Sequence, residues 1–317
     1  PNLTASSLRR ADRKTSAIGL LLDDVANPFS SALHRAVEEV ARGRGTLVFA
    51  GSSDEDPDRE RELLLALVAR RVDGLIAFPV PAGARNPDAR NPDAPGGAPG
   101  GAFGGAGGGR ARLLSESRLG RPMVVVDRPL PTGDVDSVTV DNRDSSRRAI
   151  GHLASHGHRR IAFLGDLRTI WTAAERYIGY LEGLAASGLP LDPRLVRHDL
   201  RSIDDAERAT VELLGAAPPA TRPSALFTGR NLITIGAVRA LQRLGLHQQV
   251  ALVGFDDILL GDLLAPRISV IAQDHAAIGR TAAELLFGRL DGDHGPARQL
   301  VVPTRLIPRG SGELPAR

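Results

Sequence analysis

The chain has 317 residues, of which 42% are hydrophobic and 24% charged, and these values are ordinary for a soluble globular protein. This length is enough for two lobes that each bury a core of their own. The sequence contains no cysteine, which excludes a disulfide framework and cysteine-ligated metal centres. It shows neither a signal-peptide pattern at its start nor an apolar run near the roughly 18 residues that a membrane helix needs. We therefore predict a cytoplasmic protein.

The formal net charge of +3 is concentrated at the start of the chain. The first 17 residues hold four basic side chains (Arg9, Arg10, Arg13 and Lys14) and one acidic side chain, Asp12. The remaining 300 residues hold 36 basic and 36 acidic side chains, which cancel. The basic arm could contact nucleic-acid phosphates, or it could be a solvated, fraying terminus.

From Ala17 onward, short apolar runs alternate with amphipathic stretches. Continuous apolar runs such as PMVVVD are typical of parallel strands that are covered on both faces. The predicted strands form a first series over 17–23, 46–51, 72–78 and 122–127, and a second over 161–165, 195–200, 224–228, 250–255 and 268–272. The predicted helices between them cover 28–43, 57–71, 142–156, 173–187, 204–215 and 231–244. Two series of βαβ units predict an α/β protein with two doubly wound parallel-sheet lobes.

Two local features refine this prediction. Asn27 before Pro28 is a plausible N-cap, because proline is favoured in the first turn of a helix. Residues 81–111 are dense in Gly, Pro and Ala and contain the tandem repeat ARNPD-ARNPD. Such a composition cannot bury enough apolar area to offset the cost of ordering the chain. We predict that this segment is a disordered surface insertion.

Several stretches of the chain, in order and covering nearly its whole length, resemble the LacI/GalR family of transcriptional regulators. The segment 140–166 carries the pattern DN…A…HL…GHRRIAFLG, and the strand–NPF–helix start at 18–45 is equally characteristic. The other matching stretches are PNLTASSLRR (1–10), ERYIGYLEGL (175–184), GRNLITIGAVRALQRLGL (229–246) and the segment beginning VALVGFDD (250–286).

The resemblance implies a periplasmic-binding-protein-like fold of type I, in which the chain crosses between the lobes three times. The N-terminal subdomain would comprise 17–140 and 273–302, and the C-terminal subdomain 141–272 and 303–317. An effector would bind in a cleft at the carboxyl ends of the strands, which also follows from the general rule for open α/β sheets.

Residues 1–16 would be the hinge that links this core to a helix-turn-helix module. Because the sequence starts at Pro1, we expect it to be a fragment without that module and with negligible operator affinity of its own. Two hinge segments would fold together on operator DNA, with Leu8 inserted between base steps of the minor groove. The predicted DNA-contacting hinge residues are Asn2, Thr4, Ala5, Leu8 and Arg9. Without DNA, the hinge is expected to be an unstructured linker.

The resemblance also implies a set of effector-binding side chains. Carboxylates and guanidinium groups would hold neighbouring hydroxyls of a sugar, and an aromatic face would cover its ring. The implied residues are Phe29, Asp127, Arg128, Trp171, Thr172, Arg176, Arg230, Asp256 and Gln273.

Purely structural roles are open alternatives for several of these residues. Asp256 could cap a helix over 258–263, as Asp257 could equally well, and Arg176 could pair with Glu175 or Asp166. Phe29 could belong to the core, and Trp171, the only tryptophan, could be a buried anchor.

Arg230 departs from the family pattern, which has asparagine or another small polar residue at this position. An added guanidinium could favour an acidic effector such as a sugar phosphate or a sugar acid. It could also face solvent or pair with Asp127 or Asp256.

The sequence lacks the patterns of an enzyme. It has no GxGxxG or GxxxxGK[ST] loop and no GxSxG turn. His152 and His156 have i,i+4 spacing, but no HExxH motif or flanking acid supports a metal site. We predict neither a cofactor nor a metal.

We therefore predict a homodimeric transcriptional regulator, expected to be a repressor, in which a small effector controls binding to operator DNA. Dimerisation would use helices 28–43 and 57–71 with their neighbours, together with helices of the second lobe. The alternative is a sugar-binding protein of a transport system with the same fold. That protein would need an export signal, and the basic hinge argues against it.

Overall fold

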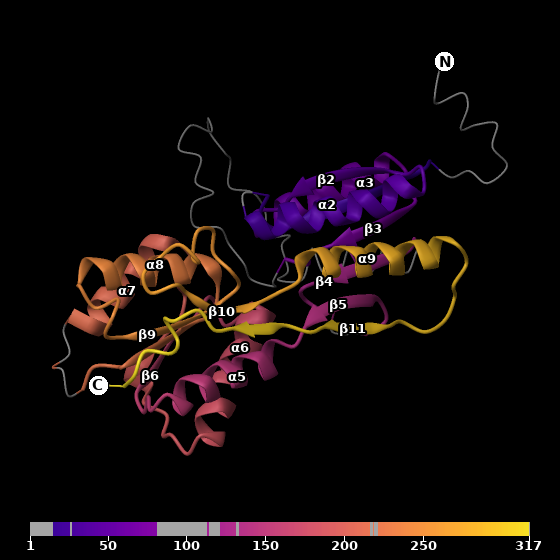
Figure 1. Ribbon diagram of the computed structural model, residues 1–317. Coiled ribbons are helices and arrows are strands. Elements are labelled where there is room, and N and C mark those ends of the chain that lie inside the picture. Colours follow the sequence, from indigo (N-terminus) through magenta and orange to yellow (C-terminus); the bar gives the residue numbers. More distant parts are fainter. Residues whose placement is uncertain are drawn as a thin grey trace, which may run out of the picture. The chain divides into compact units, whose positions relative to one another are not determined.

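The computed structural model describes residues 15–25, 27–80, 113, 121–130, 133–215, 218 and 221–316 (Figure 1). The described chain forms two compact units. The first ends at Thr139 and resumes over Asp274–Val302, and the second comprises Val140–Gln273 and the chain from Pro303 onward. The predicted insertion 81–111 and the hinge residues Asn2, Thr4, Ala5, Leu8 and Arg9 lie outside the described residues.

The first unit contains a sheet of six described strands in the order β11-β5-β4-β3-β1-β2. β1 to β5 are all paired in parallel, and β1, β3 and β4 are buried along their whole length. The strands are β1 (Ala17–Leu22), β2 (Leu47–Ser52), β3 (Gly74–Ala77), β4 (Met123–Val126), β5 (Asp136–Val140) and β11 (Gln299–Val302). Continuous apolar runs therefore became strands with both faces covered, as predicted.

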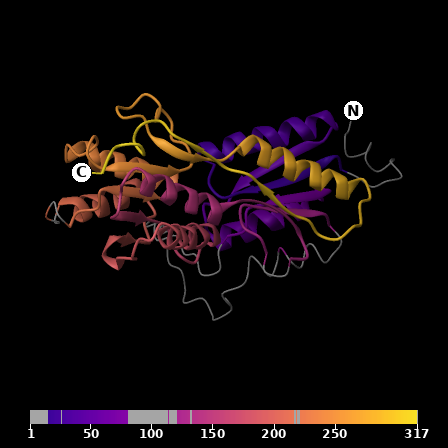
Figure 2. The same ribbon diagram turned by 60° about the horizontal axis from the view of Figure 1, so that its bottom comes forward.

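Three described helices cover this first sheet: α2 (Pro28–Gly43), α3 (Pro57–Ala69) and α9 (His275–Leu290). α2 and α9 lie side by side (Figures 1 and 2), and a Cβ atom placed on Gly279 would come within 2.7 Å of the Leu33 carbonyl oxygen. The missing side chain at Gly279 thus allows the two helices to approach closely. The predicted N-cap is confirmed, since Asn27 Oδ1 accepts a hydrogen bond from the Phe29 amide at 3.2 Å.

The second unit contains another sheet of six described strands, in the order β12-β10-β9-β8-β6-β7. All neighbours are parallel except β12, which runs antiparallel to β10. The strands are β6 (Ile161–Leu164), β7 (Val196–Arg197), β8 (Ala225–Thr228), β9 (Ala251–Phe255), β10 (Ser269–Ala272) and β12 (Arg305–Ile307). Together with the first unit and the three chain crossings, this confirms the predicted fold class.

The helices of the second unit pack in two pairs on opposite faces of its sheet, α5 with α6 and α7 with α8 (Figure 1). The elements are α5 (Asn142–Ser155), α6 (Trp171–Ala186), the short 3₁₀ helix η1 (Pro193–Leu195), α7 (Ile203–Gly215) and α8 (Asn231–Arg243). Gly179 lets α6 approach the Arg143 carbonyl oxygen, which would lie 2.2 Å from a Cβ atom at that position. Each described pair therefore buries one face of each helix.

Besides the short 3₁₀ helix η1, four described elements were not predicted, and the helix considered over 258–263 is absent. The sequences of the strands β5 and β12 and of the helix α9 lack a continuous apolar run or a clean amphipathic stripe. Strand β11 is short, mostly exposed and lies at the edge of its sheet. Residues 258–263 form turns instead of the helix considered for them. Leu260 has φ +64°, in the left-handed region, and this interrupts a right-handed helix. β7 covers only two residues of the predicted 195–200.

His158 ties the chain after Pro303 to the second sheet. Its buried ring places Nε2 2.8 Å from the Leu314 carbonyl oxygen and Nδ1 2.9 Å from Ser224 Oγ. Because a carbonyl can only accept, Nε2 carries the hydrogen, and Nδ1 accepts a hydrogen bond from the serine hydroxyl. Burial lowers the pKa of His158 below its ordinary value.

This shift predicts acid sensitivity of the fold. The unfolded chain takes up a proton at His158 at a higher pH than the folded chain does, so stability falls as pH drops below about 6.5, the ordinary histidine pKa. We expect the free energy of unfolding to decline more steeply between pH 7.5 and 5 in the wild type than in His158→Gln. Urea titrations across this pH range measure the difference. Parallel pH profiles for the two proteins would contradict the assignment.

Candidate effector site

The first group of predicted effector residues lies at the carboxyl edge of the first sheet, the edge where its parallel strands end. Asp127 and Arg128 directly follow β4, Glu55 follows β2, and Asp23 follows β1. Parallel strands present the residues after their carboxyl ends at one edge, so side chains distant in sequence meet there. The structure thus brings Asp127 and Arg128 together with two acids that were not predicted as site residues.

Arg128 is buried and is the centre of this group. Its Nη2 lies 2.5 Å from Glu55 Oε1, its Nη1 lies 2.9 Å from Glu55 Oε2, and its Nε lies 3.3 Å from Asp127 Oδ2. Burial by itself would lower the pKa of Arg128, but the charge and hydrogen bonds of Glu55 outweigh it and the pKa is raised. The guanidinium is therefore held as a cation, with Asp127 at its more exposed side.

Asp23 adds a further carboxyl group to the same edge. Burial raises its pKa, while the charge of Arg128 and the hydrogen bond from Ser30 Oγ to Asp23 Oδ1 (2.8 Å) lower it in part. The sequence had shown only an acidic pair at 23–24 and gave no sign that Asp23 lies near Arg128. Because Asp23 and Arg128 are far apart in the sequence, only the fold shows that they interact.

Phe29 lies half-buried in the first turn of α2. Its ring makes edge-on contacts with Phe78 at 6.2 Å and with His275 at 4.1 Å between ring centroids. These aromatic contacts fix the ring next to the carboxyl end of β3. Packing and effector contact remain compatible roles for a half-buried ring, so effector contact by Phe29 stays a prediction.

The second group of predicted residues lies at the carboxyl edge of the second sheet. Arg230 follows β8, Asp256 follows β9 and Gln273 follows β10. Gln273 Nε2 donates a hydrogen bond to Asp256 Oδ1. The alternative role of Asp256 or Asp257 as the cap of a helix over 258–263 does not apply, because the following residues form turns; Asp257 pairs with Arg309, 2.6 Å away.

Asp127 and Asp256 occupy equivalent positions in the two units. Each is the residue directly after a central strand, and each has a left-handed backbone, with φ +69° and +68°. Each also donates its amide hydrogen to the neighbouring strand, to the Val138 carbonyl and to the Ile271 carbonyl respectively, both at 2.9 Å. Aspartate and asparagine tolerate this conformation better than most residues, and such strained positions cluster at functional sites.

Arg176 reaches the carboxyl edge of the second sheet from α6, where it is buried. Its Nε donates to Asn142 Oδ1 and its Nη1 donates to the Gly229 carbonyl oxygen, both at 2.8 Å. The guanidinium carbon lies 3.7 Å from the centroid of the Phe255 ring. Two hydrogen bonds and a stacking contact therefore fix the plane of this cation. Asn142, which was not predicted, is one of the groups that orient it.

Arg230 pairs with an acid that was not among its expected partners. Its Nη1 lies 2.7 Å from Asp166 Oδ2, at the carboxyl end of β6. Arg201 approaches the other oxygen of the same carboxylate, with Nε 3.7 Å from Oδ1. Neither Arg201 nor Asp166 had been predicted to bind an effector.

Trp171 and Thr172 open helix α6. Thr172 is buried, whereas Trp171 is partly exposed in the first turn. No side chain caps the N-terminus of this helix in the described structure. Both residues lie near the carboxyl end of β6. That they line an effector site stays a prediction.

Comparison with known proteins decides the family. Residues 150–312 match the family described as periplasmic binding protein-like domain. The chain is 32% identical to the HTH-type transcriptional regulator PtxS of Pseudomonas aeruginosa, over 98% of this chain and 82% of that protein. The chain belongs to the LacI/GalR family of transcriptional regulators.

Solved structures agree with this LacI/GalR assignment. A putative ribose operon repressor from Burkholderia thailandensis is similar with a TM-score of 0.75 and 28% identity, over 92% of this chain and 98% of that one. The transcriptional regulator CelR in complex with cellobiose is similar with a TM-score of 0.77 and 26% identity, over 94% of this chain and 85% of that one. This LacI/GalR-family chain is therefore a regulator and not an enzyme.

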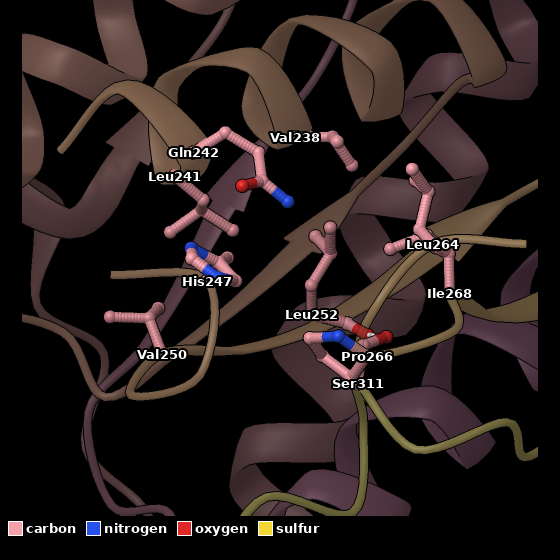
Figure 3. Close-up of a pocket in the computed structure, with 10 residues that line it drawn as sticks. All are labelled: Val238, Leu241, Gln242, His247, Val250, Leu252, Leu264, Pro266, Ile268 and Ser311. Carbon is pink, nitrogen blue, oxygen red and sulfur yellow. Dashed lines mark hydrogen bonds between the residues drawn. The ribbon is translucent and has the colours of Figure 1, made fainter. Parts of the chain in front are cut away.

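Two cavities of the LacI/GalR-family chain lie away from the predicted effector residues. One, between α8 and the start of β9, has an apolar lining with Gln242 and His247 among its residues (Figure 3). Its volume of about 10 Å³ is room for a single water molecule. The other, of about 300 Å³, lies where β4 and β5 begin, and the guanidinium of Arg289 in its wall is held by Asp136 at 2.7 Å. Neither is lined by a predicted effector residue.

Two further findings concern the described residues. They contain no group of three or more His, Cys, Asp or Glu side chains arranged to hold a metal ion. None of the helices they form is long and apolar enough to cross a membrane.

Proposed function

We propose that this chain is the effector-sensing core of its regulator and that it binds a small sugar or sugar derivative. The observation that carries the proposal is the position of Arg176, which is fixed by Asn142, Gly229 and the Phe255 ring. The left-handed Asp256 directly follows Phe255 in the chain. A planar guanidinium and a carboxylate provide donors and acceptors in the geometry that adjacent hydroxyls require. The cellobiose bound to the related CelR supports this ligand class.

The first unit would contribute a second set of polar groups. Asp127 presents its carboxylate next to the buried Arg128, and Phe29 offers an aromatic face at the start of α2. Trp171, Thr172, Arg230 and Gln273 complete the proposed effector residues. Polar side chains and aromatic surfaces of this kind are typical of small-molecule sites.

The effector would control the binding of the regulator to operator DNA in the cytoplasm. The regulator would act as a repressor. The effector would favour one of two conformations of the core and so change the affinity of hinge and helix-turn-helix for DNA. A coupling free energy of about 1–3 kcal/mol corresponds to a roughly 5- to 150-fold change in operator affinity. The relative PtxS is an HTH-type transcriptional regulator, which supports this role over that of a transport protein.

The regulator would act as a homodimer. Exposed apolar side chains support this, since Leu259 and Leu263, in one turn region of the second unit, are 85% and 74% exposed. Large exposed apolar side chains that gather in one place mark association surfaces. We expect sedimentation analysis to give twice the chain mass and Leu259→Asp/Leu263→Asp to give the monomer mass. A wild-type chain that sediments as a monomer would contradict the dimer.

A thermal-shift screen tests the proposed effector class. Monosaccharides, disaccharides and their acidic derivatives are added singly, and a binder raises the melting temperature by mass action. Asp256→Asn keeps a residue that tolerates left-handed φ but removes the charge, so we expect it to weaken the binder by about tenfold or more. Asp262→Asn, in the exposed turn nearby, is the matched control. If no sugar of any kind raises the melting temperature, the proposed function is wrong.

A further inference from the structure

A cavity of about 300 Å³ lies at the amino edge of the first sheet, where β4 and β5 begin. Its lining comes from the residues before these two strands, from the end of α9 and from the segment 293–297 that follows. Arg121 comes two residues before β4, whereas the predicted effector residue Asp127 directly follows that strand. The four residues of β4 therefore separate this cavity from the predicted effector group, and its volume is sufficient for a small molecule.

Arg289 gives one wall of the cavity a fixed shape. Its Nε and Nη2 donate hydrogen bonds to the two carboxylate oxygens of Asp136, at 2.7 and 2.8 Å. Its Nη1 donates to the carbonyl oxygens of Asp293 at 3.0 Å and of Gly295 at 2.6 Å, which ties the segment after α9 to this arginine. The carboxylate of Asp293 pairs in turn with Arg298. The two acids and two arginines of this network thus balance one another's charge.

The charge of Arg121 is not balanced in this way. Its Nη1 is closed off from solvent and has no hydrogen-bond partner in the described structure. No ion pair joins Arg121 to an acid among the described residues. A buried N–H group of a cation is costly when it lacks an acceptor and the charge lacks a counter-ion. An anion that reaches Arg121 from the cavity, which this residue lines, would offset part of that cost.

Asp134 brings the opposite charge to the same cavity. It precedes β5, is exposed, and has no ion pair with a cation among the described residues. Because Val124 of β4 is paired with Asp136 of β5, the chain at Asp134 lies alongside the chain just before β4. Neighbouring strands lie about 4.8 Å apart, so one small molecule can reach both Asp134 and Arg121.

The apolar residues Met123, Val135 and Ala297 contribute to the rest of the lining. A ligand that carries a carboxylate, an ammonium group and a small apolar portion fits these three kinds of surface. We propose that the cavity is a second ligand site, in which Arg121 binds the carboxylate and Asp134 the ammonium group of an α-amino acid. Charge-assisted hydrogen bonds would hold both ends of the molecule. This site is independent of the sugar effector, whose proposed residues lie at the carboxyl edges of the sheets.

Thermal shift measures binding at this site. The standard L-amino acids are added singly to the wild type, Arg121→Gln and Asp134→Asn, and affinity is taken from the concentration dependence of the melting temperature. We expect at least one amino acid to stabilise the wild type, and each variant to weaken its affinity by about tenfold. The control is Arg44→Gln, which removes an arginine that pairs with Asp291 at 2.5 Å, just after α9 but outside the cavity lining. Because Asp134 is exposed, its variant should fold normally, and the melting temperature without ligand reports a folding defect in either variant.

Calorimetry then separates an amino-acid site from a simple anion site. It compares the amino acid that binds with its deaminated carboxylate and its decarboxylated amine, which for L-alanine are propionate and ethylamine. We expect both analogues to bind more weakly by a factor of about ten or more, and Asp134→Asn to bind the amino acid and its deaminated carboxylate alike. Asp256→Asn, at the carboxyl edge of the second sheet, should bind the amino acid as the wild type does.

Three results would overturn the site. They are that no amino acid raises the melting temperature, that the deaminated carboxylate binds the wild type as tightly as the amino acid, or that Arg121→Gln binds like the wild type. None of them bears on whether a sugar binds, so the sugar-sensing function stands or fails separately.

Discussion

Replacing Arg128 by methionine is expected to lower the free energy of unfolding by about 3–5 kcal/mol, the usual cost of breaking a buried ion pair on one side. The guanidinium is buried against Glu55 at 2.5 and 2.9 Å and lies 3.3 Å from Asp127. Its removal would leave these two carboxylates, with Asp23 beside them, without the cation that offsets their desolvation. Methionine retains most of the side-chain volume, so the effect reports charge and not a cavity.

Urea denaturation at pH 7.5 measures this effect. Arg59→Met is the matched control, because Arg59 pairs with Asp54 in the same unit but is 54% exposed. An exposed pair contributes about 0–1 kcal/mol, so the control should unfold nearly as the wild type does. Lowering the pH should narrow the difference in unfolding free energy between Arg128→Met and the wild type, because protonation removes the charge of the carboxylates that lose this cation. Equal destabilisation by the two substitutions would show that Arg128 does not have the electrostatic role assigned to it.

The sequence predicted the parts of the fold that are decided locally. The strands β1, β3 and β4 are buried throughout and appear in the sequence as unbroken apolar runs. The start of helix α2 can be predicted from the sequence, because Asn27 supplies a cap and Pro28 a preset backbone angle. The alternation of such runs with helices then leaves few topologies other than two doubly wound lobes.

The missed elements depend on tertiary context. The strand β5 reads DSVTV, and its Asp136 is tolerated in a buried strand because Arg289 binds it with two hydrogen bonds of 2.7 and 2.8 Å. Helix α9 buries residues around much of its circumference, so it shows no amphipathic stripe. Strand β11 is mostly exposed and lies at an edge of its sheet. Periodicity cannot find elements whose partners are remote.

The same limit applies to the site. Resemblance placed Asp127, Arg176 and Asp256 among the candidates, and the strand order places each of them at or beside a carboxyl edge. Their partners could not be predicted in this way, since Glu55 lies 73 residues from Arg128 and Asn142 lies 34 residues from Arg176. Glu55 stands in the acid-rich run SSDEDPDRERE, where nothing distinguishes it from Asp54 or Asp56. Only the fold selects it.

Replacing Arg176 by lysine is expected to weaken effector binding by about 10- to 100-fold, although the charge is kept. The guanidinium uses its Nε toward Asn142 and its Nη1 toward Gly229, and its plane lies over the Phe255 ring at 3.7 Å. These contacts fix the orientation of the guanidinium plane. An ammonium group is a point charge that cannot satisfy both partners and present a planar fork at the same time.

Calorimetry with a sugar that raises the melting temperature measures this loss, and Arg143→Lys is the control. Arg143 pairs at 3.2 Å with Glu175, which lies on α6 beside Arg176, but Arg143 is 47% exposed. The Arg143→Lys variant should therefore bind the sugar as the wild type does. Asn142→Ala tests how much the orientation of the guanidinium matters for binding. It leaves Arg176 in place but removes the side-chain oxygen that accepts the hydrogen bond of its Nε. We expect an intermediate loss of about 3- to 10-fold, the value of one neutral hydrogen bond. Unchanged affinity in Arg176→Lys would mean that the charge alone acts there, and the planar geometry that favours hydroxyl recognition would then have no part in binding.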